Sequence, residues 1–178
     1  MLKINEIYAS IQGESSHTGL LCVFIRLTGC NLRCSWCDTA YAFYEGNDLT
    51  IEETLQKVET FGLPLVEITG GEPLLQENVY PLMEALLKKG YRVMLETGGA
   101  LPIDKVPERV IKILDIKCPG SGEEKKNHLE NLKFLSPHDE VKFVLLDRAD
   151  YEWSRDLLQK HNLSTAQVLF SPVYDKLN

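Results

Sequence analysis

The chain has 178 residues, of which 44% are apolar and 25% charged, with a formal net charge of −7. This length and composition are typical of one soluble globular domain with its own core. The acidic balance disfavours a broad surface for nucleic acid or for an anionic membrane. No stretch approaches the ~20 apolar residues of a membrane span, and the first residues lack the features of a secretory signal. We therefore expect a cytoplasmic protein that binds neither nucleic acid nor membrane.

Segments with strand character and segments with helix character alternate along the chain. Apolar, β-branched runs predict the strands, and apolar residues at helical spacing predict the helices. Thr50 and Glu53 form a predicted capping box, and Gly90 suits the end of the second helix. A polar, cysteine-bearing loop is expected at 28–48. The predicted strands are 4–11, 21–27, 65–69, 91–97, 110–117, 141–146 and 168–172, and the predicted helices are 51–58, 79–89, 127–135 and 150–161, the last with Asp150 as its cap.

These strands are too apolar to have one face in water, which predicts a mostly parallel sheet covered by helices. Polar and glycine-rich stretches recur just after strands, at the end where β/α barrels build their active sites. There are too few strands and helices for a closed eight-fold barrel. We expect an α/β fold, a partial, open (β/α) barrel with about six mostly parallel strands, in which residues 1–178 form a single domain.

Three of the five cysteines, Cys30, Cys34 and Cys37, fall within eight residues of one another. Clustered thiols in a cytoplasmic protein indicate metal ligands before disulfides. Three thiolates can hold three corners of an iron–sulfur cubane and leave the fourth iron open, whereas a structural zinc site needs four ligands. Cys22, in an apolar run, is expected to be a small buried hydrophobe, and Cys118 is remote in sequence. A zinc knuckle or three unrelated thiols is the plain alternative.

The spacing Cys-x3-Cys-x2-Cys resembles the signature of the radical S-adenosylmethionine (SAM) superfamily. Thr69-Gly70-Gly71-Glu72-Pro73 resembles the superfamily's glycine–glycine–glutamate motif, which contacts the SAM amino group largely through its backbone. The resemblance implies a [4Fe-4S] cluster whose open iron binds SAM. It also implies reductive cleavage of SAM to methionine and a 5′-deoxyadenosyl radical, with no catalytic residue beyond the cluster and SAM. The residues that it implies for SAM binding are Gly71, Glu72, Glu96, Lys117, Cys118 and Pro119.

The N-terminal segments 6–14 and 24–30, together with 37–39 and 117–123, resemble 7-carboxy-7-deazaguanine synthases. The resemblance covers about residues 4–172 and is weak from residue 124 onward. It implies a lyase that converts 6-carboxy-5,6,7,8-tetrahydropterin to 7-carboxy-7-deazaguanine with loss of ammonia, a step towards queuosine and other 7-deazapurines. It also implies Mg2+ at the active site and a homodimer. A flavodoxin is the usual kind of electron donor for such enzymes.

The resemblance assigns the substrate to Gln12, Gly13, Glu14, Arg26 and Thr69. Gln12 and Glu14 have the donors and acceptors that a pterin's amide and amino edge requires, and a guanidinium at position 26 can clamp a carboxylate. Taken alone, Gln12, Glu14 and Arg26 would each be interpreted as surface or ion-pair residues. Thr39 resembles the Mg2+ ligand of the family, since a hydroxyl oxygen suits that hard cation.

Two features depart from the family pattern. Its members usually carry a further C-terminal segment that reaches the active site, whereas this chain ends at Asn178. Truncation and a short variant both remain open, so no C-terminal substrate contact is assigned. His17 lies where relatives tend to have a simpler glycine-rich loop, and we expect it to be solvated and without a role.

Two other functions remain as alternatives. An enzyme that activates glycyl-radical enzymes would share the cluster and the fold, although the Gln12–Glu14 segment and Arg26 suit a small anionic pterin better. A non-enzymatic zinc or iron–sulfur module would need Cys22 or Cys118 as a fourth ligand.

Overall fold

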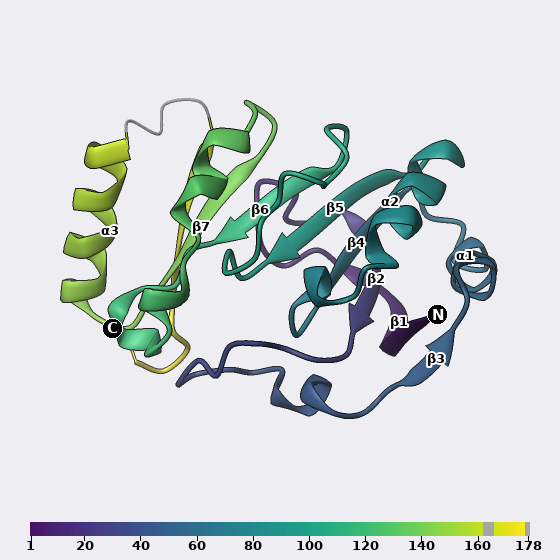
Figure 1. The fold of residues 1–178 in the computed structure, drawn as a ribbon, viewed down its shortest axis with the longest axis horizontal. Helices are drawn as coiled ribbons and strands as arrows, with labels where there is room; N and C mark the ends of the chain where they lie inside the picture. Colours follow the sequence, from purple (N-terminus) through teal and green to yellow (C-terminus); the bar gives the residue numbers. More distant parts are fainter. Residues whose placement is uncertain (162–165, 177–178) are drawn as a thin grey trace.

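The protein is described here by a computed structural model that covers residues 1–161 and 166–176. Its centre is a sheet of eight strands in the order β3-β1-β2-β4-β5-β6-β7-β8 (Figure 1). β1 runs antiparallel to β2 and to β3, and β2 then begins a series of six strands that are all parallel. The strands are β1 (Leu2–Ile11), β2 (Leu21–Leu27), β3 (Asn47–Leu49), β4 (Leu65–Gly70), β5 (Arg92–Thr97), β6 (Ile111–Asp115), β7 (Glu140–Leu145) and β8 (Gln167–Pro172).

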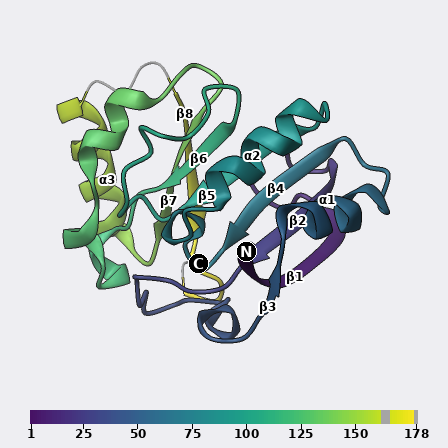
Figure 2. The same cartoon turned by 45° about the vertical axis from the view of Figure 1, so that its right-hand side comes forward.

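Three α-helices, α1 (Ile51–Glu59), α2 (Val79–Lys88) and α3 (Arg148–His161), flank the sheet (Figures 1 and 2). Leu55, Leu82 and Leu157, one from each helix, belong to the same buried cluster as sheet residues such as Val66 and Leu95. Since alternate residues of a strand face opposite sides, Val66 and Leu95 mark the helix-covered face of the sheet. None of the helices in the described part of the chain is long and apolar enough to cross a bilayer.

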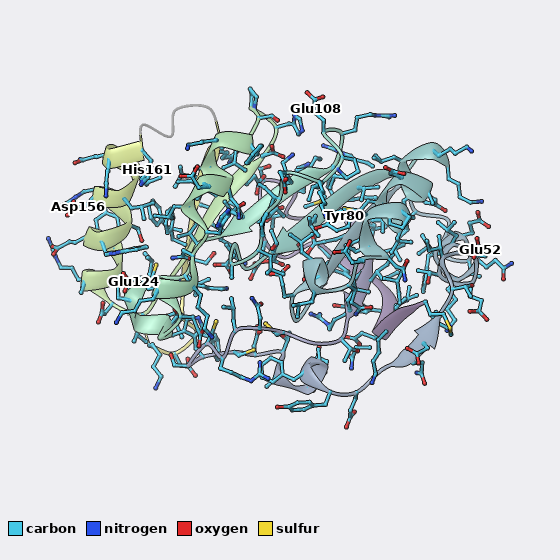
Figure 3. All side chains as sticks on the ribbon, viewed as in Figure 1. Glu52, Tyr80, Glu108, Glu124, Asp156 and His161 are labelled. Atoms are coloured by element: carbon cyan, nitrogen blue, oxygen red, sulfur yellow. The ribbon has the colours of Figure 1, made fainter. Side chains whose placement is uncertain are left out.

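The opposite face of the sheet, here called the inner face, carries a smaller apolar cluster. The cluster contains Phe24, Met94 and Ile113 and lies against no α-helix residue. Towards the carboxyl ends of the parallel strands, the same alternation brings charged residues to this face. At the periphery, by contrast, the charged side chains of Glu52, Glu108 and Asp156 point away from the sheet (Figure 3).

The predicted α/β fold, an open and mostly parallel barrel, is confirmed, with eight strands instead of about six. Six parallel strands are present, and the antiparallel β1 and the short β3 extend the sheet beyond them. β3 overlaps the end of the expected loop 28–48, because Leu2, Lys3 and Ile4 offer it a free edge for pairing. The single-domain prediction for 1–178 remains a prediction, and the chain end at Asn178 lies outside the described residues.

Two predicted local features are confirmed. Thr50 accepts from the Glu53 backbone N–H at 3.1 Å, and the Glu53 carboxylate accepts from the Thr50 N–H at 2.8 Å, which completes the capping box. Gly90, at φ +89°, follows the last turn of α2.

Two predicted helices differ in detail from the structure. The helix predicted at 127–135 is present as a shorter 3₁₀ helix, Leu129–Phe134. α3 begins at Arg148, ahead of its predicted cap at Asp150. The Asp150 carboxylate instead accepts from the backbone N–H groups of Gly120 and Leu146 at 2.8 and 2.9 Å, which ties α3 to the turn after β6.

Candidate active site

The loop that carries Cys30, Cys34 and Cys37 runs past the carboxyl ends of the parallel strands (Figure 1). Leu32, 2% exposed, anchors the loop in the protein interior. Ser35 fixes its far side, donating from its backbone N–H to Ser121 O and from its hydroxyl to Gly120 O, both at 3.0 Å. The loop is therefore held against the turn after β6 before any ligand binds.

The three loop thiols are free, half-buried and close enough to influence one another. Burial raises the pKa of Cys30 and of Cys34, and each of these pKa values is raised further by the charges of the neighbouring thiols. Within residues 1–161 and 166–176, no three His, Cys, Asp or Glu side chains converge on a single metal ion. Three thiols on one loop can supply three corners of a cubane, whereas a structural zinc ion needs a fourth ligand.

Neither remaining cysteine is available as a fourth ligand. Cys22 is fully buried, and its surroundings raise its pKa to about 12, chiefly through burial. Cys118 is 1% exposed and its sulfur lies 3.3 Å from the Ser154 hydroxyl, away from the loop thiols. The expected burial of Cys22 is confirmed, and the donor set fits a [4Fe-4S] cluster with one open iron.

The Gly70-Gly71-Glu72 turn packs directly against the start of the cysteine loop. Gly71 N–H donates to Leu27 O at 3.1 Å and Glu72 N–H to Gly29 O at 2.7 Å. A Cβ atom at position 71 would collide with the Gly29 carbonyl, so only glycine permits this approach. The first residues of the cysteine loop and the turn after β4 thus form one rigid unit.

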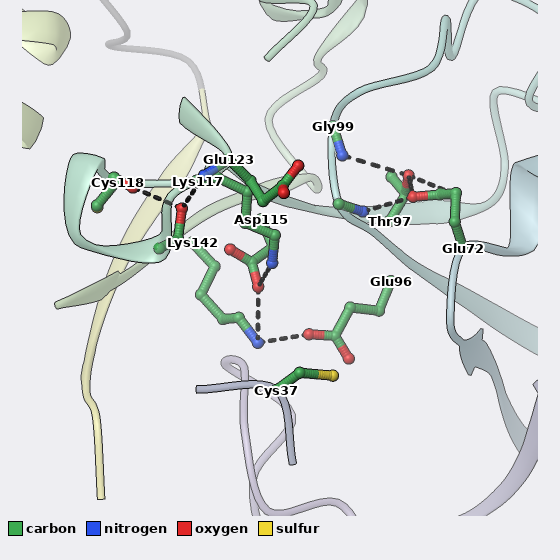
Figure 4. A network of polar contacts seen from close by, with 12 residues as sticks. Cys37, Glu72, Glu96, Thr97, Gly99, Asp115, Lys117, Cys118, Glu123 and Lys142 are labelled. Carbon is green, nitrogen blue, oxygen red and sulfur yellow. Dashed lines mark hydrogen bonds and ion pairs between the residues drawn. The ribbon is translucent and has the colours of Figure 1, made fainter. Parts of the chain in front are cut away.

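The Glu72 carboxylate is fully buried and is satisfied by the protein itself. It accepts from the Thr97 hydroxyl and the Gly98 N–H at 2.8 Å and from the Leu74 N–H at 3.0 Å. Figure 4 shows this side chain joining the turn after β4 to the end of β5. The predicted SAM contact of Glu72 therefore has to come from its backbone, while the side chain orients the two turns.

Lys142, on β7, is the centre of the polar inner face and was not predicted as a site residue. It is 4% exposed. Its ammonium forms an ion pair with Glu96 and lies 3.7 Å from Asp115 (Figure 4). It also forms an ion pair with Glu14 at 2.5 Å. The signal in the sequence was a charged residue inside the apolar run 141–145, which by itself also suits a surface position.

Glu67, on β4, is a second inner-face residue that sequence reasoning missed. It is 3% exposed, and burial raises its pKa to about 9, with the charges of Glu96 and Glu14 adding to the effect. Its carboxyl group is therefore protonated at neutral pH. The side-chain N–H of Gln12 donates to this group, and the side-chain carbonyl oxygen of Gln12 accepts from the Glu14 backbone N–H at 2.9 Å.

The structure thus brings the predicted substrate residues Gln12, Glu14 and Thr69 to the same face as Glu96. The Thr69 hydroxyl lies 3.4 Å from the Glu96 carboxylate on the neighbouring strand. Gly13 lies between Gln12 and Glu14, exposed and with open space around its Cα.

Arg26 lies in register with Thr69, but protein groups already hold it. Its Nε donates to Glu6 at 2.7 Å and its Nη2 to the Tyr8 hydroxyl at 2.9 Å. Its guanidinium also lies 5.8 Å from the centre of the Tyr41 ring. Among the described residues, Nη1 has no acceptor, so a carboxylate clamp at Arg26 would use this remaining edge.

Lys117 extends the polar network to the cysteine loop. It pairs with Asp115 at 2.9 Å, and its positive charge acts on the Cys34 thiol. Of the other predicted SAM residues in this turn, the Cys118 side chain points away from the site, and Pro119 is exposed. Only Lys117 brings its side chain to the site.

Thr39, the predicted Mg2+ ligand, directly precedes the 3₁₀ turn Ala40–Phe43. Its hydroxyl makes no capping hydrogen bond there and lies 3.8 Å from the Cys37 sulfur. A hydroxyl oxygen beside the cluster ligands has the chemistry that a hard cation requires.

His17 was expected to be solvated, and this expectation is wrong. It is 9% exposed, and its Nε2 lies 2.8 Å from Arg92 Nη2. Its neighbour Ser16 donates its backbone N–H to Glu140 at 3.1 Å. The loop after β1 therefore packs under the amino ends of β5 and β7, a contact between distant segments that local sequence does not encode.

Comparison with known proteins identifies the family. Residues 24–118 match the family model described as the radical SAM superfamily. A 7-carboxy-7-deazaguanine synthase from Koribacter versatilis (strain Ellin345) is 51% identical, and the alignment covers 98% of this chain and 79% of the relative. The synthase from Chlorobaculum tepidum is 44% identical, with 99% and 82% covered.

Solved structures agree with this assignment. The crystal structure of QueE from Escherichia coli superimposes with a TM-score of 0.82 at 25% identity, covering 98% of this chain and 85% of that one. Streptococcus suis SuiB bound to S-adenosylmethionine has a TM-score of 0.63 at 15% identity, covering 83% and 39%, and shares the fold alone. The chain belongs to the 7-carboxy-7-deazaguanine synthase family of the radical SAM superfamily.

Proposed function

We propose that this protein is a radical SAM lyase that converts 6-carboxy-5,6,7,8-tetrahydropterin to 7-carboxy-7-deazaguanine with loss of ammonia. The observation that carries the proposal is the position of three free thiols beside an inner sheet face lined with Gln12, Glu14, Thr69 and Glu96. Relatives with this name are similar over almost the whole chain. The cofactors are a [4Fe-4S] cluster, SAM and Mg2+.

When bound, the cluster and SAM supply the radical that abstracts hydrogen from the substrate. The protein's own groups orient the two ligands and exclude water around them. Cys30, Cys34 and Cys37 hold the cluster. The backbone of the Gly71–Glu72 turn and the side chain of Glu96 contact SAM.

On the substrate side, the acceptors at Gln12 and Glu14 bind the amide and amino edge of the pterin. The remaining edge of Arg26 binds its carboxylate. Thr39 supplies one oxygen to Mg2+, whose other ligands come from water and substrate.

We also propose that the protein is a cytoplasmic homodimer that takes electrons from a flavodoxin. These proposals follow from the family resemblance. Light scattering of the holoenzyme tests the dimer, and product formation with reduced flavodoxin as the only reductant tests the donor.

The activity is tested by anaerobic reconstitution with iron and sulfide, followed by incubation with the carboxytetrahydropterin, SAM, Mg2+ and reductant. We expect a brown protein that forms 7-carboxy-7-deazaguanine. Cys34→Ser should lose most of the bound iron and all product, because one cluster corner is missing. Cys22→Ser, at a buried thiol outside the loop, is the matched control and should keep both.

The outcomes separate the alternatives. A brown wild-type protein that cleaves SAM without forming the deazapurine would favour the glycyl-radical activating function, which the relatives above do not favour. A colourless, zinc-loaded protein would favour the binding module.

A further inference from the structure

Lys142 joins two carboxylates that come from different elements of the fold. Glu14 lies in the loop after β1, among the residues proposed for substrate, and its side chain is 56% exposed. Glu96 lies near the end of β5, where SAM is proposed to bind, and its side chain is 24% exposed. The Lys142 ammonium, 6% exposed at its side chain, pairs with both. Figure 4 shows the pair with Glu96.

The charges around Lys142 explain why a cation is required there. Glu14, Glu96 and Asp115 all lie within ion-pair distance of its ammonium. Asp115 has a second partner in Lys117. Within residues 1–161 and 166–176, Lys142 is the only basic side chain in ion-pair distance of Glu14 or Glu96. Without it, these two carboxylates would repel each other with no cation beside them to balance the repulsion.

The Glu14 side chain is the part of this network that a bound ligand would order. Glu14 is more than half exposed, and the ion pair with Lys142 is what directs its carboxylate towards the inner face. A ligand that binds Glu96 or Glu14 restricts Lys142, and through it the other carboxylate. The second ligand then has less conformational entropy to lose, which gives positive cooperativity between the sites.

We propose that Lys142 is a positioning residue that couples the affinity for the pterin to the affinity for SAM. This inference rests on the proposed function, because it takes Glu14 as a substrate contact and Glu96 as a SAM contact. It goes beyond that function by predicting reciprocal coupling: SAM must tighten pterin binding by the same factor as the pterin tightens SAM binding.

A purely structural role for Lys142 is the alternative, and a second buried lysine supplies the control. Lys112, on β6, is 3% exposed and forms an ion pair with Asp139 at 2.9 Å. It alternates with the inner-face residues Ile111 and Ile113, so it lies on the other face of the sheet. Replacement of either lysine by methionine removes one buried ammonium from the same sheet.

The experiment compares the reconstituted wild type with Lys142→Met and Lys112→Met. Equilibrium dialysis under anaerobic conditions measures the Kd of SAM with and without the carboxytetrahydropterin, and the Kd of the pterin with and without SAM. Iron content and the cluster absorption confirm equal cluster loading, and thermal unfolding reports stability.

In the wild type, we expect each ligand to lower the Kd of the other about fivefold or more. Lys142→Met should raise both Kd values about tenfold and bring the coupling factor close to one. Lys112→Met should lower the unfolding temperature and leave the coupling factor unchanged.

Failure of the proposed function and failure of the coupling by Lys142 give different results. If the wild type does not bind the pterin or does not convert it, the proposed function is wrong and the inference is overturned with it. If the wild type converts the pterin but shows no coupling, or if Lys142→Met keeps the wild-type coupling factor, the inference alone is overturned.

Discussion

Single residues in the inner face have pKa values that differ from those of the same residues in water. Lys142 remains charged although it is buried, because three carboxylates surround it and hold its pKa well above its ordinary value. Glu67 is driven the other way: burial raises its pKa to about 9, and the neighbouring carboxylates add to this. A neutral carboxyl group beside a charged pair limits the negative charge that Lys142 has to balance.

The protonated state of Glu67 predicts a dependence of stability on pH. The folded protein keeps this proton up to about pH 9, whereas the unfolded chain releases it near the ordinary pKa of 4.5. The folded state therefore binds more protons in that interval, and stability falls as the pH rises through it.

Glu67→Gln should remove this contribution. Its free energy of unfolding, measured in urea at pH 6 and pH 9, should fall less than that of the wild type, by about 1 kcal/mol or more. Glu108→Gln, at an exposed carboxylate, should follow the wild type. Equal pH slopes for Glu67→Gln and wild type would contradict the protonated state.

At the scale of the element, the ends of helices and strands stabilise the fold and position the site. The capping box fixes where α1 begins, and α1 packs Leu55 and Val58 into the core. The turn after β4 is a different kind of end, because its glycines bring it into hydrogen-bond contact with Leu27 and Gly29. The first kind of end stabilises the fold, and the second positions the site.

Thr50→Ala should therefore reduce stability without affecting the site. Loss of the side-chain acceptor for the Glu53 N–H should cost about 1 kcal/mol in urea unfolding, with SAM affinity unchanged. Glu52→Gln, in the same first turn but outside the capping box, is the control and should cost much less. A loss of SAM affinity in Thr50→Ala would contradict the separation of the two roles.

For the whole molecule, the two faces of the sheet differ in composition and in role. The helix-covered face holds the large apolar core, and at its edge the buried pair Lys112–Asp139 ties β6 to the segment before β7. The inner face has a small apolar cluster and a network of charges. The Lys112–Asp139 pair thus stabilises the fold on one face, and the Lys142 pairs, as proposed, position the ligand-binding groups on the other.

Asp139→Ala should test the structural pair. It leaves the Lys112 ammonium buried without its carboxylate and removes the acceptors for the backbone N–H groups of Lys112 and Ser136. The expected loss in the free energy of unfolding is about 3–5 kcal/mol. The double variant Lys112→Met/Asp139→Ala should recover part of it in the same urea titration. A loss below about 1 kcal/mol for Asp139→Ala would show that the pair contributes little.

The sequence by itself determined the features that depend on local order along the chain. The alternation of apolar strands and helices predicted the open, parallel fold, and Thr50 with Glu53 predicted a helix start, because both depend on neighbouring residues. The spacing of Cys30, Cys34 and Cys37 predicted the cluster, since three ligands on one loop need no distant partner.

Only the tertiary structure decided which charged residues share the inner face. Glu14, Glu96, Asp115 and Lys142 come from four segments, and the strand register brings them together. Each is a charged residue in a segment whose local pattern is equally compatible with a surface position. The same limit explains His17, whose burial depends on Arg92 and Glu140 far along the chain. Pairing between distant strands sets these contacts, and no local pattern in the sequence encodes it.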